Sequence, residues 1–278
     1  MPEILTQAQL DAFRRDGFIA PVDGVAADQA RATLDRIEAF ERDTGQDASR
    51  AIRVRAVLVL RCLYDLVSSP RVIGALRDVL GPNVGLYLSG VWSKMPGGSK
   101  FVSWHQDGAY YAFDRHVSVT AWLALTDSTD EKGCVKVIPG SHRDPVHAHD
   151  ETYDPDNLLS RGQSIRDIDP AKAVNMELRA GQFSIHHEMV VHGSAANLGD
   201  SRRIGISFSC IPTDVKALEG PQSILLLSGE NLPGHWQLDP APRYDFDPLS
   251  MAALERVQQA YRNPAFRNEE ERARRRKA

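Results

Sequence analysis

Apolar residues recur at helical spacing through the first third of the chain. Thr6 and Gln9 have the spacing of a capping box, and the amphipathic segment that they open ends at an Asp-Gly pair. Ala, Leu and Ile residues repeat with the same period over residues 26–43 and again over residues 70–80, where a Gly-Pro break follows. The pattern predicts helices over about residues 1–80.

Later apolar residues form short runs such as VGLYLSGVWSKM, VSVTAWLAL and RRIGISFSCI. These runs are rich in β-branched and aromatic side chains, and Gly, Pro, Asp or Asn separate them. Many short strands without alternating helices predict an antiparallel sheet that is closed or sandwiched, as in a jelly roll or a barrel.

No internal repeat or low-complexity linker marks a domain boundary, so we expect a single domain over residues 1–278. Its expected parts are N-terminal helices over about 1–80, a sheet core over about 83–215, and a C-terminal extension and helix over about 216–278. Residues 143–175 form the longest polar stretch without strand character. An insert of this length in a compact domain is more often functional than accidental.

The composition is that of an ordinary soluble protein, with 42% hydrophobic and 25% charged residues. A net charge of −4 gives no electrostatic reason to expect nucleic acid or an anionic membrane as a partner. The chain has no signal pattern and no long apolar run, and its three cysteines lie far apart, so we expect a cytoplasmic protein without disulfides or a cysteine zinc site. The basic C-terminal tail is expected to be a solvated helix end; its basic residues are Arg272, Arg274, Arg275, Arg276 and Lys277.

The segment WHQDGAYYAF contains a candidate metal site. If residues 102–107 are extended, His105 and Asp107 project from the same face, roughly 6–7 Å apart along the strand. A histidine from another strand would complete two histidines and one carboxylate, a set that suits Fe(II) and leaves coordination positions open. The pair alone fits a surface or core polar contact equally well.

A second segment, HHEMVVHGSAANLGDSRRIGISFS, supplies further candidates. His192 opens an H-G-S-x-x-N turn, and Arg203 follows eleven residues later, where its guanidinium could bind a carboxylate with two parallel hydrogen bonds. Alternation places Arg203 on a small, polar face with Ser207 and Ser209, whereas Arg202 shares its face with apolar residues. We therefore expect Arg203 to face the site.

Taken together, WHQD, the VIPGSH turn, AGQFSIHHEMVVHGSAAN and the trailing arginine resemble the phytanoyl-CoA dioxygenase family of Fe(II)/2-oxoglutarate-dependent oxygenases. The resemblance covers residues 6–214, approximately. It implies a mainly β fold with flanking helices around a double-stranded β-helix, a jelly-roll core of the cupin-like type. It also implies Fe(II), 2-oxoglutarate as co-substrate, and O₂.

The resemblance assigns roles to individual residues. The implied iron ligands are His105, Asp107 and His192. Arg203 would bind the distal carboxylate of 2-oxoglutarate, and the other implied co-substrate contacts are Ser194, Trp122, Gln106 and Lys94. Halogenating relatives replace the carboxylate ligand by a small residue, so the presence of Asp107 favours hydroxylation.

Several other polar residues have two interpretations each. Tyr110, Tyr111, Arg161 and Gln163 are candidate substrate contacts, although packing or an exposed loop explains them as well. Alternation allows only one of the histidines at positions 186 and 187 to face the site, in a hydrogen-bonding or core role. The remaining expectations are a structural His142 and solvated His147 and His149.

The expected reaction is hydroxylation of an unactivated C–H bond of a small polar or anionic metabolite, such as an amino-acid derivative, a phosphonate or a secondary metabolite, with succinate and CO₂ as co-products. One alternative is a metal-dependent hydrolase, although the chain has no H-E-x-x-H motif. The other is a non-catalytic jelly-roll binding protein. The sequence indicates a small-molecule substrate, no nucleic-acid or membrane partner, and no particular oligomeric state.

Overall fold

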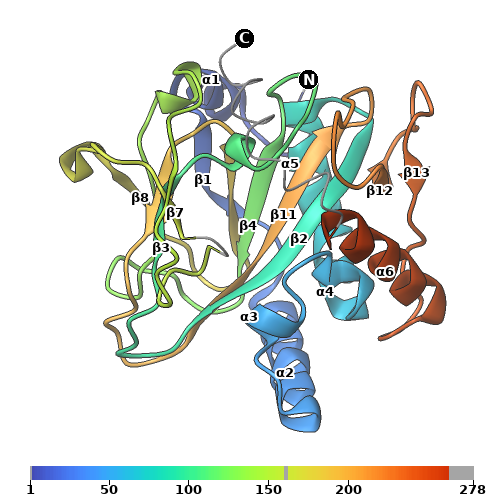
Figure 1. The fold of residues 1–278 in the computed structure, drawn as a ribbon, viewed down its shortest axis with the longest axis horizontal. Helices are drawn as coiled ribbons and strands as arrows, with labels where there is room; N and C mark the ends of the chain where they lie inside the picture. The colour runs from blue at the N-terminus through green and yellow to red at the C-terminus, as the bar shows by residue number, and fades with distance from the viewer. Residues whose placement is uncertain (1, 160–161, 263–278) are drawn as a thin grey trace.

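Two β-sheets face each other, and helices cover the outer face of the larger sheet (Figure 1). Residues of both sheets line a cavity. The computed structural model describes residues 2–159 and 162–262. Arg161 and the basic tail therefore lie outside the described residues. The described helices are α1 (Gln7–Asp16), α2 (Ala27–Thr44), α3 (Ala48–Ala51), α4 (Arg61–Val67), α5 (Pro70–Leu80) and α6 (Pro248–Arg262), with 3₁₀ turns that include η1 (Ala56–Leu58) and η2 (Asp107–Ala109).

The strands follow the helical region, apart from the first. They are β1 (Phe18–Asp23), β2 (Val84–Lys94), β3 (Val102–His105), β4 (Val119–Ala124), β5 (Val135–Val137), β6 (Asp150–Glu151), β7 (Gln163–Ser164), β8 (Val174–Met176), β9 (Gln182–His187), β10 (His192–Ser194), β11 (Arg203–Pro212), β12 (Ser223–Ser228) and β13 (Gln237–Leu238). The larger sheet has the order β1-β9-β4-β11-β2-β12-β13, and the smaller has the order β3-β10-β5-β8. Neighbouring strands are antiparallel except β12 and β13. This confirms the predicted jelly-roll architecture.

Alternation along the strands of the larger sheet separates the hydrophobic core from the cavity. On β11, Ile204, Ile206 and Phe208 are fully buried in the main core, which also contains residues of α2, α4 and α5. Arg203 and Ser207, on the other face of the same strand, line the cavity instead. The expected polarity of the two faces of this strand is therefore observed.

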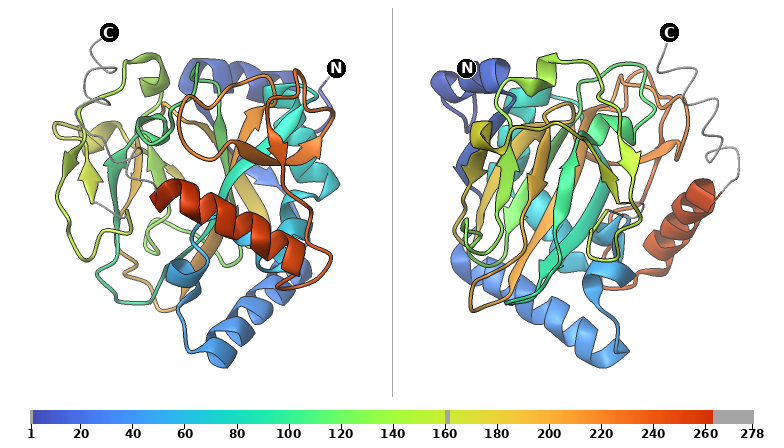
Figure 2. Two further views of the ribbon diagram at one scale, coloured as in Figure 1. Left: turned by 45° about the vertical axis from the view of Figure 1, so that its right-hand side comes forward. Right: turned by 60° about the vertical axis from the view of Figure 1, so that its left-hand side comes forward.

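The predicted helices form close to their expected positions. At the start of α1, the Thr6 hydroxyl accepts from the Gln9 backbone while the Gln9 side chain accepts from the Thr6 backbone, which makes the predicted capping box. The final helix is α6, which lies on the outside of the molecule in both views of Figure 2 and contributes Ala253 and Leu254 to the main core. Among the described residues, no helix is long and apolar enough to cross a membrane.

The insert at residues 143–175 differs from expectation in two respects. It contains strand pairing, because β6 pairs with β7, and β7 lies next to β3 (Figure 1). The Ser103 hydroxyl of β3 donates to the Gln163 carbonyl of β7. His149 is half-buried and not solvated, since its Nε2 accepts a hydrogen bond from the Gln106 backbone at 3.0 Å. His147 is also half-buried. The insert thus forms part of the cavity region.

Candidate metal centre and its cavity

Strand pairing in the smaller sheet brings two histidines together. β10 runs antiparallel to β3 with His192 directly opposite His105, and their ring centroids lie 4.0 Å apart. The His105 Nδ1 lies 2.8 Å from the Ser103 carbonyl oxygen, and the His192 Nδ1 lies 3.0 Å from the Val190 carbonyl oxygen. These backbone bonds fix both rings so that each Nε2 remains available as a ligand atom.

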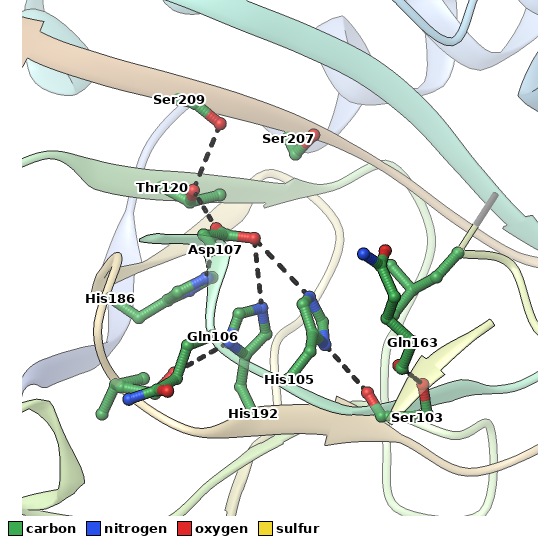
Figure 3. A network of polar contacts seen from close by, with 12 residues as sticks. Ser103, His105, Gln106, Asp107, Thr120, Gln163, His186, His192, Ser207 and Ser209 are labelled. Atoms are coloured by element: carbon green, nitrogen blue, oxygen red, sulfur yellow. Dashed lines mark hydrogen bonds and ion pairs between the residues drawn. The ribbon is translucent and has the colours of Figure 1, made fainter. Parts of the chain in front are cut away.

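Asp107 completes the cluster from just beyond the end of β3. The strand stops at His105, and Asp107 begins the turn η2, which differs from the extended conformation predicted for it. Its Oδ1 nevertheless lies 3.5 Å from the His105 Nε2 and 3.8 Å from the His192 Nε2 (Figure 3). Ligand atoms of all three residues lie within 4.8 Å of one another, so one ion could contact all three.

The outer oxygen of the Asp107 carboxylate has partners of its own. The Thr120 hydroxyl donates to Oδ2 at 2.8 Å and lies 3.3 Å from the Ser209 hydroxyl, which accepts from Tyr111 at 2.9 Å. This chain of hydroxyls orients one carboxylate oxygen and leaves the other, Oδ1, directed at the histidines (Figure 3).

The charge state of the cluster suits metal binding. Burial alone would raise the pKa of the Asp107 carboxyl, but the charge of His192 and the close polar contacts with His105 and His186 hold that pKa well below its usual range. Burial, followed by the charges of His105 and His186, lowers the pKa of His192 well below its usual value. A carboxylate and a neutral imidazole are the forms that bind a metal ion.

The two adjacent histidines face different regions, as alternation requires. His186 is 2% exposed, lines the cavity, and places its Nε2 3.7 Å from the Asp107 Oδ2. Its ring nitrogens have no hydrogen-bond partner among the described residues. His187 lies in a separate depression with His142, whose Nε2 contacts the Arg14 carbonyl oxygen at 3.3 Å.

A buried arginine occupies another part of the cavity wall. Arg203 is 1% exposed, and its Cζ lies 4.1 Å from the centroid of the Trp122 ring. Its Nε donates to the Ser128 hydroxyl at 3.2 Å, its Nη2 is buried without a partner, and no carboxylate of the described residues lies within 4.0 Å. Burial lowers the pKa of Arg203 to about 10. A buried cation of this kind is suited to an anionic ligand.

Ser194 lies on the cavity wall, whereas Lys94 lies behind it. The Lys94 Nζ donates to the Ser194 hydroxyl at 2.6 Å and to the Ala195 carbonyl. Burial, and then the charge of Arg203, lowers the pKa of Lys94 to about 6. Lys94 therefore supports Ser194 and does not reach the cavity in this structure.

Two further predicted contacts are not on the cavity wall. Gln106 projects from the opposite face to His105 and Asp107, and its side-chain amide donates to the Met189 carbonyl at 2.9 Å and accepts from the His147 backbone at 2.8 Å (Figure 3). Gln163 is buried in β7. Strand alternation accounts for the position of Gln106.

The cavity has a volume of about 670 Å³, within the range of small-molecule sites. Tyr110 and Tyr111, the candidate substrate contacts, lie on its wall. Other residues from outside the sheets also line the cavity, and the sequence did not identify them. They are Arg53 and Val54 from the N-terminal region, and Tyr153 and Leu159 from the insert. Arg53 gave one detectable signal, as one of two charged residues, with Arg55, in the otherwise apolar segment AIRVRAVLVL.

Comparison with known proteins places this architecture among non-haem iron enzymes. The sequence model of a family described as phytanoyl-CoA dioxygenase (PhyH) matches residues 13–205. A probable alpha-ketoglutarate-dependent hypophosphite dioxygenase from Stutzerimonas stutzeri is 30% identical over 167 residues, which cover 59% of this chain and 58% of that protein. The chain thus spans little more than half of this relative.

Solved structures match a larger share of this chain than the sequence relative does. The apo form of the non-heme monooxygenase ThoJ is 27% identical with a TM-score of 0.79, covering 92% of this chain and 99% of that one. CytC3 with Fe(II) and alpha-ketoglutarate has the same fold, with a TM-score of 0.65, 20% identity, and coverage of 88% and 97% of the two chains.

Proposed function

The chain belongs to the phytanoyl-CoA dioxygenase family, and we propose that it is an Fe(II)/2-oxoglutarate-dependent oxygenase that hydroxylates an unactivated C–H bond of a small polar or anionic metabolite. An amino-acid derivative, a phosphonate or a secondary metabolite would fit this class, and succinate and CO₂ would be the co-products. The observation that carries the proposal is the presence, in one cavity, of a three-ligand cluster and a buried arginine without an acidic partner among the described residues.

The ligand set fits iron. Two imidazole nitrogens and one carboxylate oxygen on one side of an ion leave its other positions open, which is the arrangement found in non-haem Fe(II) oxygenases. In this chain the ligand atoms would be the Nε2 atoms of His105 and His192 and the Oδ1 of Asp107. The backbone bonds at each Nδ1 and the Thr120 bond at Oδ2 already hold these groups in the required orientation.

Iron, 2-oxoglutarate and O₂ supply the oxidation when they are bound, and the protein supplies their placement. Arg203 would bind the distal carboxylate of 2-oxoglutarate, because its Nη2 is buried and has no partner within the described part of the chain. The Trp122 ring holds the guanidinium plane from one side and so limits the directions in which it can donate. Fixing one geometry of the co-substrate is a form of positional catalysis.

Two features support the finer parts of the proposal. Asp107 provides a carboxylate at the position where halogenating relatives have a small residue and so make room for a halide, and this favours hydroxylation. The hypophosphite dioxygenase relative acts, by its name, on a small oxyanion, which supports an anionic substrate. We also propose that residues 1–278 act as one domain, since one core cluster joins N-terminal helices, the larger sheet and α6.

An anaerobic titration tests the proposal. Fe(II) and then 2-oxoglutarate are added to the apoprotein, and the weak visible charge-transfer band of the iron–2-oxoglutarate complex is recorded. We expect a band that saturates near one equivalent in the wild type, is lost in Asp107→Ala, and needs far more 2-oxoglutarate in Arg203→Met. Arg202→Met is the matched control and should behave as the wild type. Bound iron without a band in the wild type would favour the non-catalytic alternative.

A further inference from the structure

Arg53 is the second arginine on the cavity wall, and we propose that it binds the anionic group of the substrate. The substrate would then be an organic oxyanion, in which a carboxylate, phosphate or phosphonate is attached to an apolar body. This inference rests on the proposed function, because it places the anion in the same cavity as the iron ligands and Arg203.

The loop between α3 and η1 brings Arg53 to the cavity. Its backbone lies directly on β2, because a Cβ at Gly90 would meet the Arg53 carbonyl oxygen at 2.6 Å. Glycine at this position allows the close approach of the two chain segments. The Arg53 side chain then extends over Trp92, with its Cζ 5.4 Å from the ring centroid. The guanidinium is thus placed against an aromatic wall inside the cavity.

The contacts of Arg53 leave most of its donors for a ligand. One Nη2 hydrogen bond goes to the Leu158 carbonyl, which ties the insert to this loop. A guanidinium has five N–H donors, and no carboxylate of the described residues lies within 4.0 Å of this one. Burial lowers the pKa of Arg53, and this desolvation is what an anionic ligand would offset.

Comparison with the other arginines shows that this lack of an acidic partner is specific to the cavity. Among the described arginines that are not exposed, those outside the cavity each have a carboxylate within 4.0 Å: Arg36 with Asp245, Arg55 with Asp239, Arg61 with Asp65 and Arg202 with Glu41. The two that lack one are Arg53 and Arg203, and both line the cavity. The fold therefore pairs its shielded arginines except where a ligand can reach them.

Arg53 and Arg203 reach the cavity at different positions along β2. Arg203 lies opposite Lys94 on β2, while the Arg53 backbone lies on Gly90, four residues along the same strand. At about 3.3 Å per residue these two backbone positions are about 13 Å apart, and each guanidinium lies over a ring of its own, Arg53 over Trp92 and Arg203 over Trp122. With 2-oxoglutarate at Arg203, an anion at Arg53 would be a second molecule.

Tyr110 lies between Arg53 and the metal ligands on the cavity wall. Tyr110 lies close enough to influence the pKa of Arg53, and its ring centroid lies 6.0 Å from that of His105. Leu88, Val54 and Leu159 add apolar surface to the same cavity. A substrate held by its anionic group at Arg53 would thus extend its apolar body past Tyr110, toward the bound iron.

Three probes of the same shape and different charge test this inference: 3-phenylpropionate, 3-phenylpropan-1-ol and 3-phenylpropylamine. Each is titrated into full-length protein loaded anaerobically with Fe(II) and saturating 2-oxoglutarate, so that Arg203 is already occupied. The readout is the relaxation rate of the probe protons by NMR, which high-spin iron accelerates for a probe in the cavity. Protein loaded with Zn(II) gives the diamagnetic reference.

We expect the carboxylate to bind at least tenfold more tightly than the alcohol, and the amine to bind most weakly. Arg53→Gln should weaken carboxylate binding by roughly tenfold to a hundredfold and leave alcohol binding unchanged, as loss of a charge-assisted hydrogen bond predicts. Arg53→Lys should retain part of the preference. Arg50→Gln, which changes an exposed arginine of the preceding helix, is the matched control and should have no effect.

Equal binding of the three probes to the wild type, or an unchanged carboxylate preference in Arg53→Gln, would overturn the inference. The charge-transfer band with 2-oxoglutarate separates this failure from failure of the proposed function, because the band does not depend on Arg53. A normal band in Arg53→Gln would also show that the cavity is intact. If Arg53→Gln does not fold, the carboxylate preference of the wild type and of Arg53→Lys still tests the inference.

Discussion

Replacing Arg203 by methionine should stabilise the apoprotein while abolishing its response to 2-oxoglutarate. Burial lowers the pKa of this arginine from 12.5 to about 10, and the side chain is 1% exposed. Since one pKa unit corresponds to about 1.4 kcal/mol, the charged form is disfavoured in the fold by about 3 kcal/mol. This penalty is present in full at pH 7, because the group is charged in both states there, and it is relieved only as the pH rises through about 10.

Methionine removes the charge and also two favourable contacts. The Nε bond to Ser128 and the stacking on Trp122 together contribute about 1–2 kcal/mol. The net expectation is a gain of about 1–2 kcal/mol in the free energy of unfolding. Arg202→Met is the matched control: its ion pair with Glu41 is partly exposed, so the variant should lose about 0.5–1 kcal/mol.

Urea unfolding, followed by circular dichroism, measures both effects. With Fe(II) under argon, 2-oxoglutarate at a hundred times its Kd should stabilise the wild type and Arg202→Met by about 2.7 kcal/mol. At the same concentration Arg203→Met should gain almost nothing. An Arg203→Met apoprotein that is less stable than the wild type, or one that gains equally from 2-oxoglutarate, would refute the reasoning.

Three further predictions follow from other contacts. Thr120→Val removes the hydrogen bond to the Asp107 Oδ2 and should weaken Fe(II) binding by roughly 10-fold or more; an unchanged Kd in an anaerobic metal titration would count against an orienting role. Because burial lowers the pKa of Lys94 to about 6, the unfolded chain binds one more proton between about pH 6 and the ordinary lysine pKa, so apoprotein stability should rise with pH by up to about 1.4 kcal/mol per unit in that window. Lys94→Met should lose this component of the slope, and identical pH profiles of the two proteins in urea unfolding would contradict it. Asp239→Asn breaks the fully buried ion pair with Arg55 and should cost about 3–5 kcal/mol in urea unfolding, whereas a loss below 1 kcal/mol would show that the pair is dispensable.

Side-chain alternation made the regular strands predictable. The choice of Arg203 over Arg202 needed only the contrast between a polar and an apolar face of one strand, and the structure has that contrast. The same rule places Gln106 on the face opposite its neighbour His105, and Gln106 is not on the cavity wall, so the expectation that it lines the co-substrate pocket was wrong on grounds that the sequence already contained. Local periodicity is thus a reliable guide within a strand.

Contacts between distant, irregular segments could not be predicted in this way. Arg53 reaches the cavity because its loop lies on Gly90, and no periodic pattern links those two positions. His149 was expected in solvent, yet it accepts a hydrogen bond from Gln106 because the insert folds back onto the end of β3. Such placements depend on the packing of loops, which composition and spacing do not specify.

We expect one cavity to hold both iron, at His105, Asp107 and His192, and 2-oxoglutarate, at Arg203. A crystal structure of the anaerobic complex, with anomalous data collected at the iron edge, tests it most directly. We expect one anomalous peak in contact with the two Nε2 atoms and the Asp107 Oδ1, and 2-oxoglutarate with its distal carboxylate on the Arg203 guanidinium. Iron bound elsewhere, or 2-oxoglutarate with its distal carboxylate on another residue, would contradict it.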